Sequence, residues 1–320
     1  MVKRKEEDIT ISRDSDRINP YIEEARLPVR RKEVVAVGYE LILGHIEDLA
    51  RRQDDIECAF YFGSRAHATS YADGWSDLDV ALITTSPDTY TKDTKWLAPM
   101  GKPLVAFNEA VSLGHGMQTR VLFAEDFSDV DFGFFTPNDF KNLINDPRFF
   151  NGVLGRGIVP IVDKTGLLTN LPLEEQKLNY TLPPLTQESL AQHVDDILYH
   201  AVNAVKKLHK GEILTAKDTL DSSIKNTLMT MIRWHIISAD PSVDTWHRNR
   251  HFEKWVDESV MLYMPQLYAV YDRDDIYSKI IVNIDFLKYL VESICSRNQI
   301  DYPPEKLSKV TDWVKQNGFK

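Results

Sequence analysis

The sequence predicts an α+β protein, in which a mixed β-sheet with flanking helices is followed by an all-helical part. Short apolar runs that suit buried strands alternate with polar turns between residues 58 and 162. From residue 186 onward, apolar side chains recur at helical spacing almost throughout. With 320 residues, the chain is long enough for two domains of ordinary size.

Changes in composition divide the chain into four predicted parts. The N-terminal stretch is charged and lacks apolar periodicity, and a cluster of prolines (Pro172, Pro183 and Pro184) breaks the pattern in the middle of the chain. We therefore predict an N-terminal arm, a sheet domain, a linker and a helical substrate-binding domain, at residues 1–28, 29–170, 171–184 and 185–320.

Each element follows from its apolar pattern. A first helix is expected over 32–52, where apolar residues from Val35 to Leu49 repeat at helical spacing, and another helix starts at Pro137. Strands are expected at 58–62, 78–84, 104–108, 120–124, 130–135 and 158–162. In the helical part, one apolar stripe runs from Leu190 to Leu208 and a second from Ile213 to Ile237, where Asp240-Pro241 ends the helix.

The charge balance limits the class of partner. The chain carries 38 basic and 48 acidic residues, a formal net charge of −10. Nucleic-acid binders usually present a basic face, so we expect no nucleic-acid partner. A negative field would attract a small cationic substrate.

Cysteine usage and the polar N-terminus indicate a cytoplasmic protein without a membrane partner. The two cysteines, Cys58 and Cys295, are far apart and belong to no Cys/His cluster, which argues against a zinc site or a disulfide framework. The first residues are too polar for a signal peptide, and no apolar run is long enough to span a bilayer.

Two aspartates at the start of a predicted strand point to a metal site. Asp77 and Asp79 are two residues apart, so both carboxylates can lie on the same face of the strand. Carboxylates are typical ligands of Mg²⁺, with substrate phosphates completing its coordination. Ahead of them, Gly63 lets the backbone approach a phosphate closely, Ser64 adds a hydroxyl and an N–H, and Arg65 adds positive charge.

A third carboxylate completes this predicted site. Asp131 lies on a strand that we expect beside the first pair. Three converging aspartates could hold two Mg²⁺ ions and favour attack of a hydroxyl on the α-phosphate of a nucleotide. An Asp-x-Asp motif alone is usually a turn or a solvated strand end, but the combined pattern is much less frequent by chance.

These motifs resemble those of the DNA polymerase β-like nucleotidyltransferases. The likeness rests on Gly63-Ser64-Arg65 and on Ser76-Asp-Leu-Asp-Val80. A closer resemblance, to the aminoglycoside 6-adenylyltransferases (streptomycin adenylyltransferases), extends into the helical part. It is carried there by Lys206-Lys-Leu208, Gly211-Glu-Ile-Leu214 and Met231-Ile-Arg-Trp-His235.

The resemblance implies transfer of AMP from ATP, with Mg²⁺, to a hydroxyl of an aminoglycoside such as streptomycin, and hence antibiotic resistance. Asp77 and Asp79 match the family's metal ligands, and Asp131 matches a third carboxylate that is a ligand or a possible base. Lys206 matches a helical lysine that could face the triphosphate, and Glu212 is a candidate for the general base.

The chain also departs from the family pattern. Ile197-Leu198 stand where the family tends to have Phe-Trp, and the N-terminal arm is longer than expected. The alternatives are therefore AMP transfer to a protein, AMP transfer to a metabolite other than an antibiotic, and a non-catalytic nucleotide-binding protein. ATP or GTP as donor, the acceptor and the oligomeric state stay open.

Overall fold

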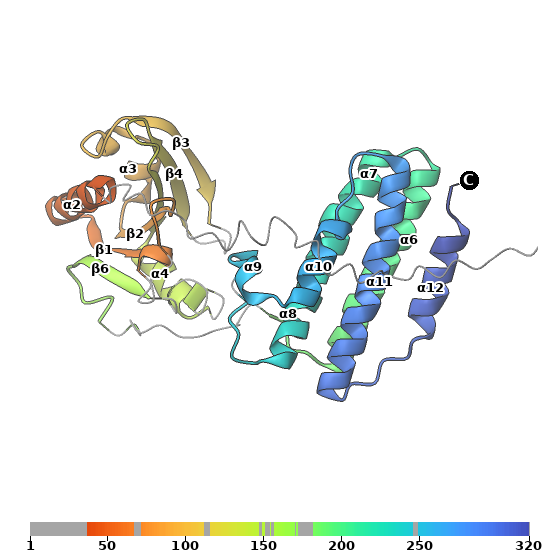
Figure 1. Ribbon diagram of the computed structural model, residues 1–320. Coiled ribbons are helices and arrows are strands. Elements are labelled where there is room, and N and C mark those ends of the chain that lie inside the picture. The colour runs from red at the N-terminus through yellow and green to blue at the C-terminus, as the bar shows by residue number, and fades with distance from the viewer. Residues whose placement is uncertain are drawn as a thin grey trace, which may run out of the picture. The chain divides into compact units, whose positions relative to one another are not determined.

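The computed structural model describes residues 37–66, 72–111, 116–146, 149–150, 154, 157–169, 171, 182–245 and 249–319. The expected N-terminal arm, and most of the expected linker, lie outside these residues. We refer to the described residues of 37–169 as the sheet half and to those of 182–319 as the helical half; Figure 1 labels their elements.

Among the described residues, six strands form one sheet in the order β3-β4-β5-β2-β1-β6. Only β2 and β5 run parallel, and the other neighbouring strands are antiparallel. The strands are β1 (Ile56–Phe62), β2 (Leu78–Thr84), β3 (Pro103–Ala110), β4 (Met117–Phe123), β5 (Asp129–Phe135) and β6 (Ile158–Asp163). All six expected strands are therefore present, with ends that either match the prediction, as both ends of β2 do, or differ from it by one to three residues.

Helices cover both faces of this sheet, because alternate residues of its central strands are apolar on each side. One face packs against α2 (Val37–Arg52) and α3 (Pro87–Thr91), and the other against α4 (Pro137–Ile144). Two 3₁₀ turns, η1 (Gly63–Arg65) and η2 (Lys95–Leu97), join the elements. Leu41, which the sequence placed on the apolar stripe of the first helix, is 56% exposed, because Ile42 and Ile46 occupy the buried side.

The helical half has its own core, centred on long helices that lie side by side in Figure 1. Its elements are α6 (Gln187–His209), α7 (Ile213–Asp218), η4 (Thr219–Ile224), α8 (Lys225–Ala239), α9 (Phe252–Trp255), α10 (Glu258–Leu267), α11 (Arg273–Asn298) and α12 (Glu305–Gln316). The predicted stripe from Leu190 to Leu208 is buried, and Trp234 of α8 is fully buried. Thr186 begins α6 with a capping box completed by Ser189.

The helix predicted over 213–237 contains a feature that the sequence did not reveal. Residues Thr219–Ile224 form a π-helical segment, η4, between the α-helical α7 and α8. Such segments are rare and short, and they shift the side chains that follow around the helix axis. The helix ends at Ala239, before Asp240, as predicted.

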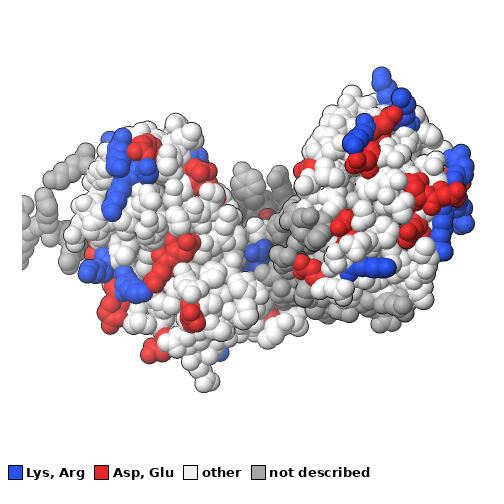
Figure 2. All heavy atoms as spheres, turned by 180° about the vertical axis from the view of Figure 1, so that it is seen from behind, with Lys and Arg blue, Asp and Glu red and all other residues white. Residues whose placement is uncertain are grey.

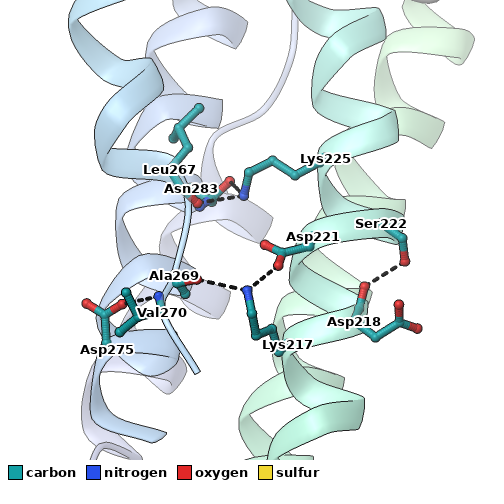
Figure 3. A network of polar contacts seen from close by, with 10 residues as sticks. All are labelled: Lys217, Asp218, Asp221, Ser222, Lys225, Leu267, Ala269, Val270, Asp275 and Asn283. Carbon is teal, nitrogen blue, oxygen red and sulfur yellow. Dashed lines mark hydrogen bonds and ion pairs between the residues drawn. The ribbon is translucent and has the colours of Figure 1, made fainter. Parts of the chain in front are cut away.

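A buried polar network anchors the connection between α10 and α11 (Figure 3). The Lys225 ammonium donates to the carbonyl of Leu267 at 2.6 Å and to Asn283 Oδ1 at 2.9 Å. It also lies 5.0 Å from the ring centroid of Tyr268. Asn283 Nδ2 donates to the same Leu267 carbonyl at 3.0 Å. These contacts satisfy the polar groups of Lys225 and Asn283 inside the helical core.

Beside this network, Lys217 makes a second link to the same connection. Its ammonium pairs with Asp221 and donates to the carbonyl of Ala269 at 2.8 Å. The side chains of Lys217 and Asp221 are 25% and 31% exposed, so this link is nearer to the solvent than Lys225, which is 4% exposed.

Acidic and basic side chains are interspersed on the face shown in Figure 2. No helix within the described ranges combines the length and apolar character that a membrane crossing requires. The two cysteines are unpaired: Cys58 is buried in β1, and Cys295 is half-buried in α11.

Candidate active site

The three aspartates singled out from the sequence meet on the α4 face of the sheet. In the parallel β2–β5 pair, Asp79 lies directly opposite Asp131, so both side chains project from the same face. Further along β2 on this face, Ala81 and Ile83 pack in the cluster that contains α4. The carboxylates stand at the other end of the strands, and Asp77 immediately precedes β2.

Carboxylate oxygens of Asp77, Asp79 and Asp131 lie within 4.8 Å of one another. Burial, and to a smaller extent the negative charges of Asp77 and Asp131, raise the pKa of Asp79 to about 7. Burial also raises the pKa of Asp131 to about 6, although the Arg120 guanidinium opposes this shift. Without a counter-charge from a ligand, these carboxylates repel one another.

Gly63 is required where η1 approaches the carboxylates. Its φ is +75°, a backbone conformation that favours glycine. A Cβ at this position would lie 2.3 Å from Asp79 Oδ2. The glycine therefore lets η1 pack directly against the Asp79 carboxylate, and its role beside a phosphate stays a prediction.

Two buried polar atoms at this site have no hydrogen-bond partner among the described residues. They are Asp131 Oδ1 and Ser64 Oγ. Asp131 is 5% exposed and Ser64 is 6% exposed. A buried polar atom without a partner is destabilising, so its presence favours a site that is completed by a ligand.

Arg65 holds the loop that leads into β2. Its Nε donates to the carbonyl of Asp77 at 2.9 Å, and its Nη2 donates to the carbonyl of Ser76 at 2.6 Å. The guanidinium carbon lies 3.9 Å from the ring centroid of Tyr39 in α2. These contacts support the position of Asp77, in addition to any phosphate contact that the sequence motif suggested.

Two polar residues of β4, which the sequence analysis did not single out, contact the third carboxylate. Arg120 Nη1 and Gln118 Nε2 donate to Asp131 Oδ2 at 2.6 Å and 2.7 Å. Arg120 Nε also donates to Glu109 Oε1 of β3 at 2.6 Å. The available signal was the two-residue spacing of Gln118 and Arg120, which places both on one face of a strand.

This arrangement fits a divalent cation such as Mg²⁺. The donor set consists of oxygen atoms, which Mg²⁺ prefers. Asp131 Oδ1 is buried and lacks a partner among the described residues, and one oxygen of the Asp131 carboxylate lies within 4.8 Å of oxygens of the two other carboxylates. Asp77, Asp79 and Asp131 are therefore the residues that would hold the ion.

The other two predicted site residues lie in the helical half. The Lys206 ammonium is 5.9 Å from the ring centroid of Trp313, in a groove between α6 and α12. Glu212 precedes α7 and accepts a hydrogen bond from Lys207 Nζ at 2.5 Å. This contact holds the pKa of Glu212 below its usual range, which makes the carboxylate a weaker base. The roles of Lys206 with the triphosphate and of Glu212 as base stay predictions.

Comparison with known proteins identifies relatives over most of the chain. A family model described as streptomycin adenylyltransferase matches residues 39–317. An aminoglycoside 6-adenylyltransferase of Campylobacter jejuni is 23% identical over 203 residues, which cover 62% of this chain and 66% of that protein. A protein of the same name from Staphylococcus aureus is 22% identical over 204 residues, covering 61% of this chain and 68% of the relative.

A solved structure is also similar. It is described as an aminoglycoside 6-adenyltransferase from Bacillus subtilis and is 17% identical in sequence, with a TM-score of 0.43. The match covers 88% of this chain and 99% of that chain.

Proposed function

Because the chain belongs to the streptomycin adenylyltransferase family, a family of nucleotidyltransferases, we propose that it transfers AMP from ATP to a hydroxyl of an aminoglycoside. The observation that supports this most directly is the convergence of Asp77, Asp79 and Asp131 within 4.8 Å, with one buried oxygen lacking a partner among the described residues. Streptomycin is the first acceptor to test.

In the proposed reaction, the acceptor hydroxyl oxygen forms a bond to the α-phosphorus of ATP. The bond from this phosphorus to the oxygen that bridges to the β-phosphate breaks, and pyrophosphate leaves with the electron pair. The hydroxyl proton passes to a base. When bound at the aspartates, Mg²⁺ would offset the negative charge that accumulates on the phosphate oxygens.

The chain's own residues have separate roles in this proposal. Asp77, Asp79 and Asp131 bind the cation, and Gly63 lets the backbone of η1 pack close to them. The Ser64 hydroxyl has no partner among the described residues and can donate to a phosphate oxygen. We assign contact with the triphosphate to Lys206, on the strength of the family motif.

The charge of the chain suits the proposed acceptor. Aminoglycosides are polycations, and the formal net charge of −10 would attract them over a distance set by the ionic strength. We expect this attraction to increase the association rate more than the final affinity.

The function is tested by measuring pyrophosphate release with ATP and Mg²⁺ against a panel of aminoglycosides and lincosamides. We expect release with streptomycin, and a product heavier than the drug by one AMP moiety. GTP replaces ATP in a parallel series to define the donor.

Two variants make this test specific. Asp77→Asn should abolish release, whereas Asp93→Asn, which changes an exposed carboxylate paired with Lys95, should not alter it. If no drug supports release although ATP binds, the aminoglycoside proposal is wrong, and proteins and other metabolites become the acceptors to test.

A further inference from the structure

The two carboxylate oxygens of Asp131 differ in their contacts. We propose that Arg120 and Gln118 are positioning residues, which hold Oδ2 so that Oδ1 alone binds the divalent cation. Both donate to Oδ2, at 2.6 Å and 2.7 Å, while Oδ1 is buried and lacks a partner among the described residues. This inference rests on the proposed function, which places the cation at the aspartates.

The sheet register produces this arrangement. Arg120 lies directly opposite Asp131 in the antiparallel β4–β5 pair, and Gln118 is two residues away on the same face. On the other side of β4, Glu109 of β3 lies opposite Gln118. Three side chains of alternating charge therefore form a row across β3, β4 and β5, namely Glu109, Arg120 and Asp131.

Glu109 fixes the orientation of the guanidinium. Arg120 Nε donates to Glu109 Oε1, while Nη1 of the same planar group donates to Asp131. One guanidinium can serve both carboxylates because its donors diverge in a fixed geometry. A lysine has a single nitrogen at the end of a flexible chain and cannot reproduce both contacts equally well.

These contacts bear on cation binding in two ways. The Arg120 charge offsets part of the repulsion within the carboxylate group, and the two hydrogen bonds limit rotation of the Asp131 carboxylate. Because Oδ2 accepts two hydrogen bonds, its lone pairs are occupied. Asp131 then acts as a ligand through Oδ1, and the acceptor's proton goes to a different residue.

The experiment measures Mn²⁺ binding by electron paramagnetic resonance of the free ion, using the full chain without nucleotide. Arg120→Met should raise the Kd for Mn²⁺ by about 10- to 100-fold, as is common when a residue that orients a metal ligand is removed. Arg120→Lys should have an intermediate effect. Glu109→Gln, which leaves Asp131 and Arg120 in place, should have the smallest effect of the three.

A matched control removes an arginine from an ion pair elsewhere in the sheet half. Arg51 pairs with Glu47 on the surface of α2 at 2.7 Å, so Arg51→Met should leave the Kd unchanged. Circular dichroism of each variant shows whether it is folded, and Glu109→Gln provides the test if Arg120→Met does not fold.

The outcomes separate this inference from the proposed function. If Arg120→Met and Glu109→Gln bind Mn²⁺ as tightly as the unaltered chain while Asp131→Asn does not, the positioning role is wrong. A lower Kd for Arg120→Met would also overturn it, because the guanidinium would then act only as a repelling charge. If Asp77→Asn and Asp131→Asn both bind Mn²⁺ normally, the metal site itself is wrong, and the inference fails with it.

Discussion

The Lys225 network of the helical half and the aspartate site of the sheet half differ in how their buried polar atoms are matched. In the helical half, Lys225 and Asn283 are buried and matched to one another and to the Leu267 carbonyl. In the sheet half, Ser64 Oγ and Asp131 Oδ1 are buried and have no partner among the described residues. Both arrangements interrupt an apolar core, but only the first is complete among the residues that the structure describes.

The difference indicates what each set of residues does. A satisfied buried network fixes a particular packing, and the Lys225 network fixes the connection between α10 and α11. An unsatisfied buried atom destabilises the free protein and gains a partner when a ligand binds. Changes to the aspartates should therefore affect activity, whereas changes to Lys225 should affect stability.

The largest expected effect is on activity. Asp79→Asn should reduce kcat/KM for AMP transfer by about 10³-fold or more, because charge stabilisation by a bound metal contributes several kcal/mol to catalysis. The free energy of unfolding should not decrease, since the substitution removes a repelling charge. Steady-state kinetics and urea denaturation check the two parts. A loss of activity that is accompanied by a lower free energy of unfolding would contradict the assignment.

The next effect is on stability. Lys225→Met removes the donor to the Leu267 carbonyl and to Asn283 Oδ1, and should lower the free energy of unfolding by about 2–4 kcal/mol. The kcat of the folded protein should stay the same. Lys217→Met is the control: its contacts are partly exposed, so the loss should be about 1 kcal/mol. Similar losses in both variants would mean that burial does not distinguish the two lysines.

The stability of the metal-free protein should depend on pH because of the Asp79 carboxylate. The pKa of Asp79 in the folded state, about 7, is above its ordinary value of 3.8, so the folded state binds more protons between these values. Stability should therefore fall as the pH rises from about 4 to about 7, by about 2 kcal/mol after allowance for partial exposure. Asp79→Asn should flatten this dependence, and Mg²⁺ should restore stability above pH 7. Melting temperatures that rise across this range would contradict the prediction.

The smallest effect comes from a pair of glycine substitutions. Gly63→Ala should lower the free energy of unfolding by about 1–2 kcal/mol and also reduce activity, because φ is +75° and the new Cβ would meet Asp79 Oδ2. Gly44→Ala, in α2 with no atom within 4 Å of a new Cβ, should instead stabilise the protein by up to about 1 kcal/mol. Thermal melts and kinetics of both variants check this. If Gly63→Ala changes neither stability nor activity, η1 can move to accommodate the added methyl group.

Local patterns in the sequence predicted the strands and the three aspartates. Alternation and apolar runs are local properties, and Asp77 and Asp79 are separated by one residue in a recognisable motif. The contacts of Arg120 and Gln118 with Asp131 could not be predicted, because they depend on the register between β4 and β5. The π-helical segment also stayed hidden, since apolar residues through Leu220 and Ile224 keep nearly helical spacing.

The positions of the two cysteines provide a separate chemical reporter for each half. Cys58 lies in the core of the sheet, and burial raises its thiol pKa far above the usual range, so it should resist alkylation in the folded protein. Cys295 lies in α11 and is only half-buried. Timed alkylation during unfolding, followed by peptide mass analysis, would therefore distinguish opening of the sheet from opening of the helices without any engineered cysteine.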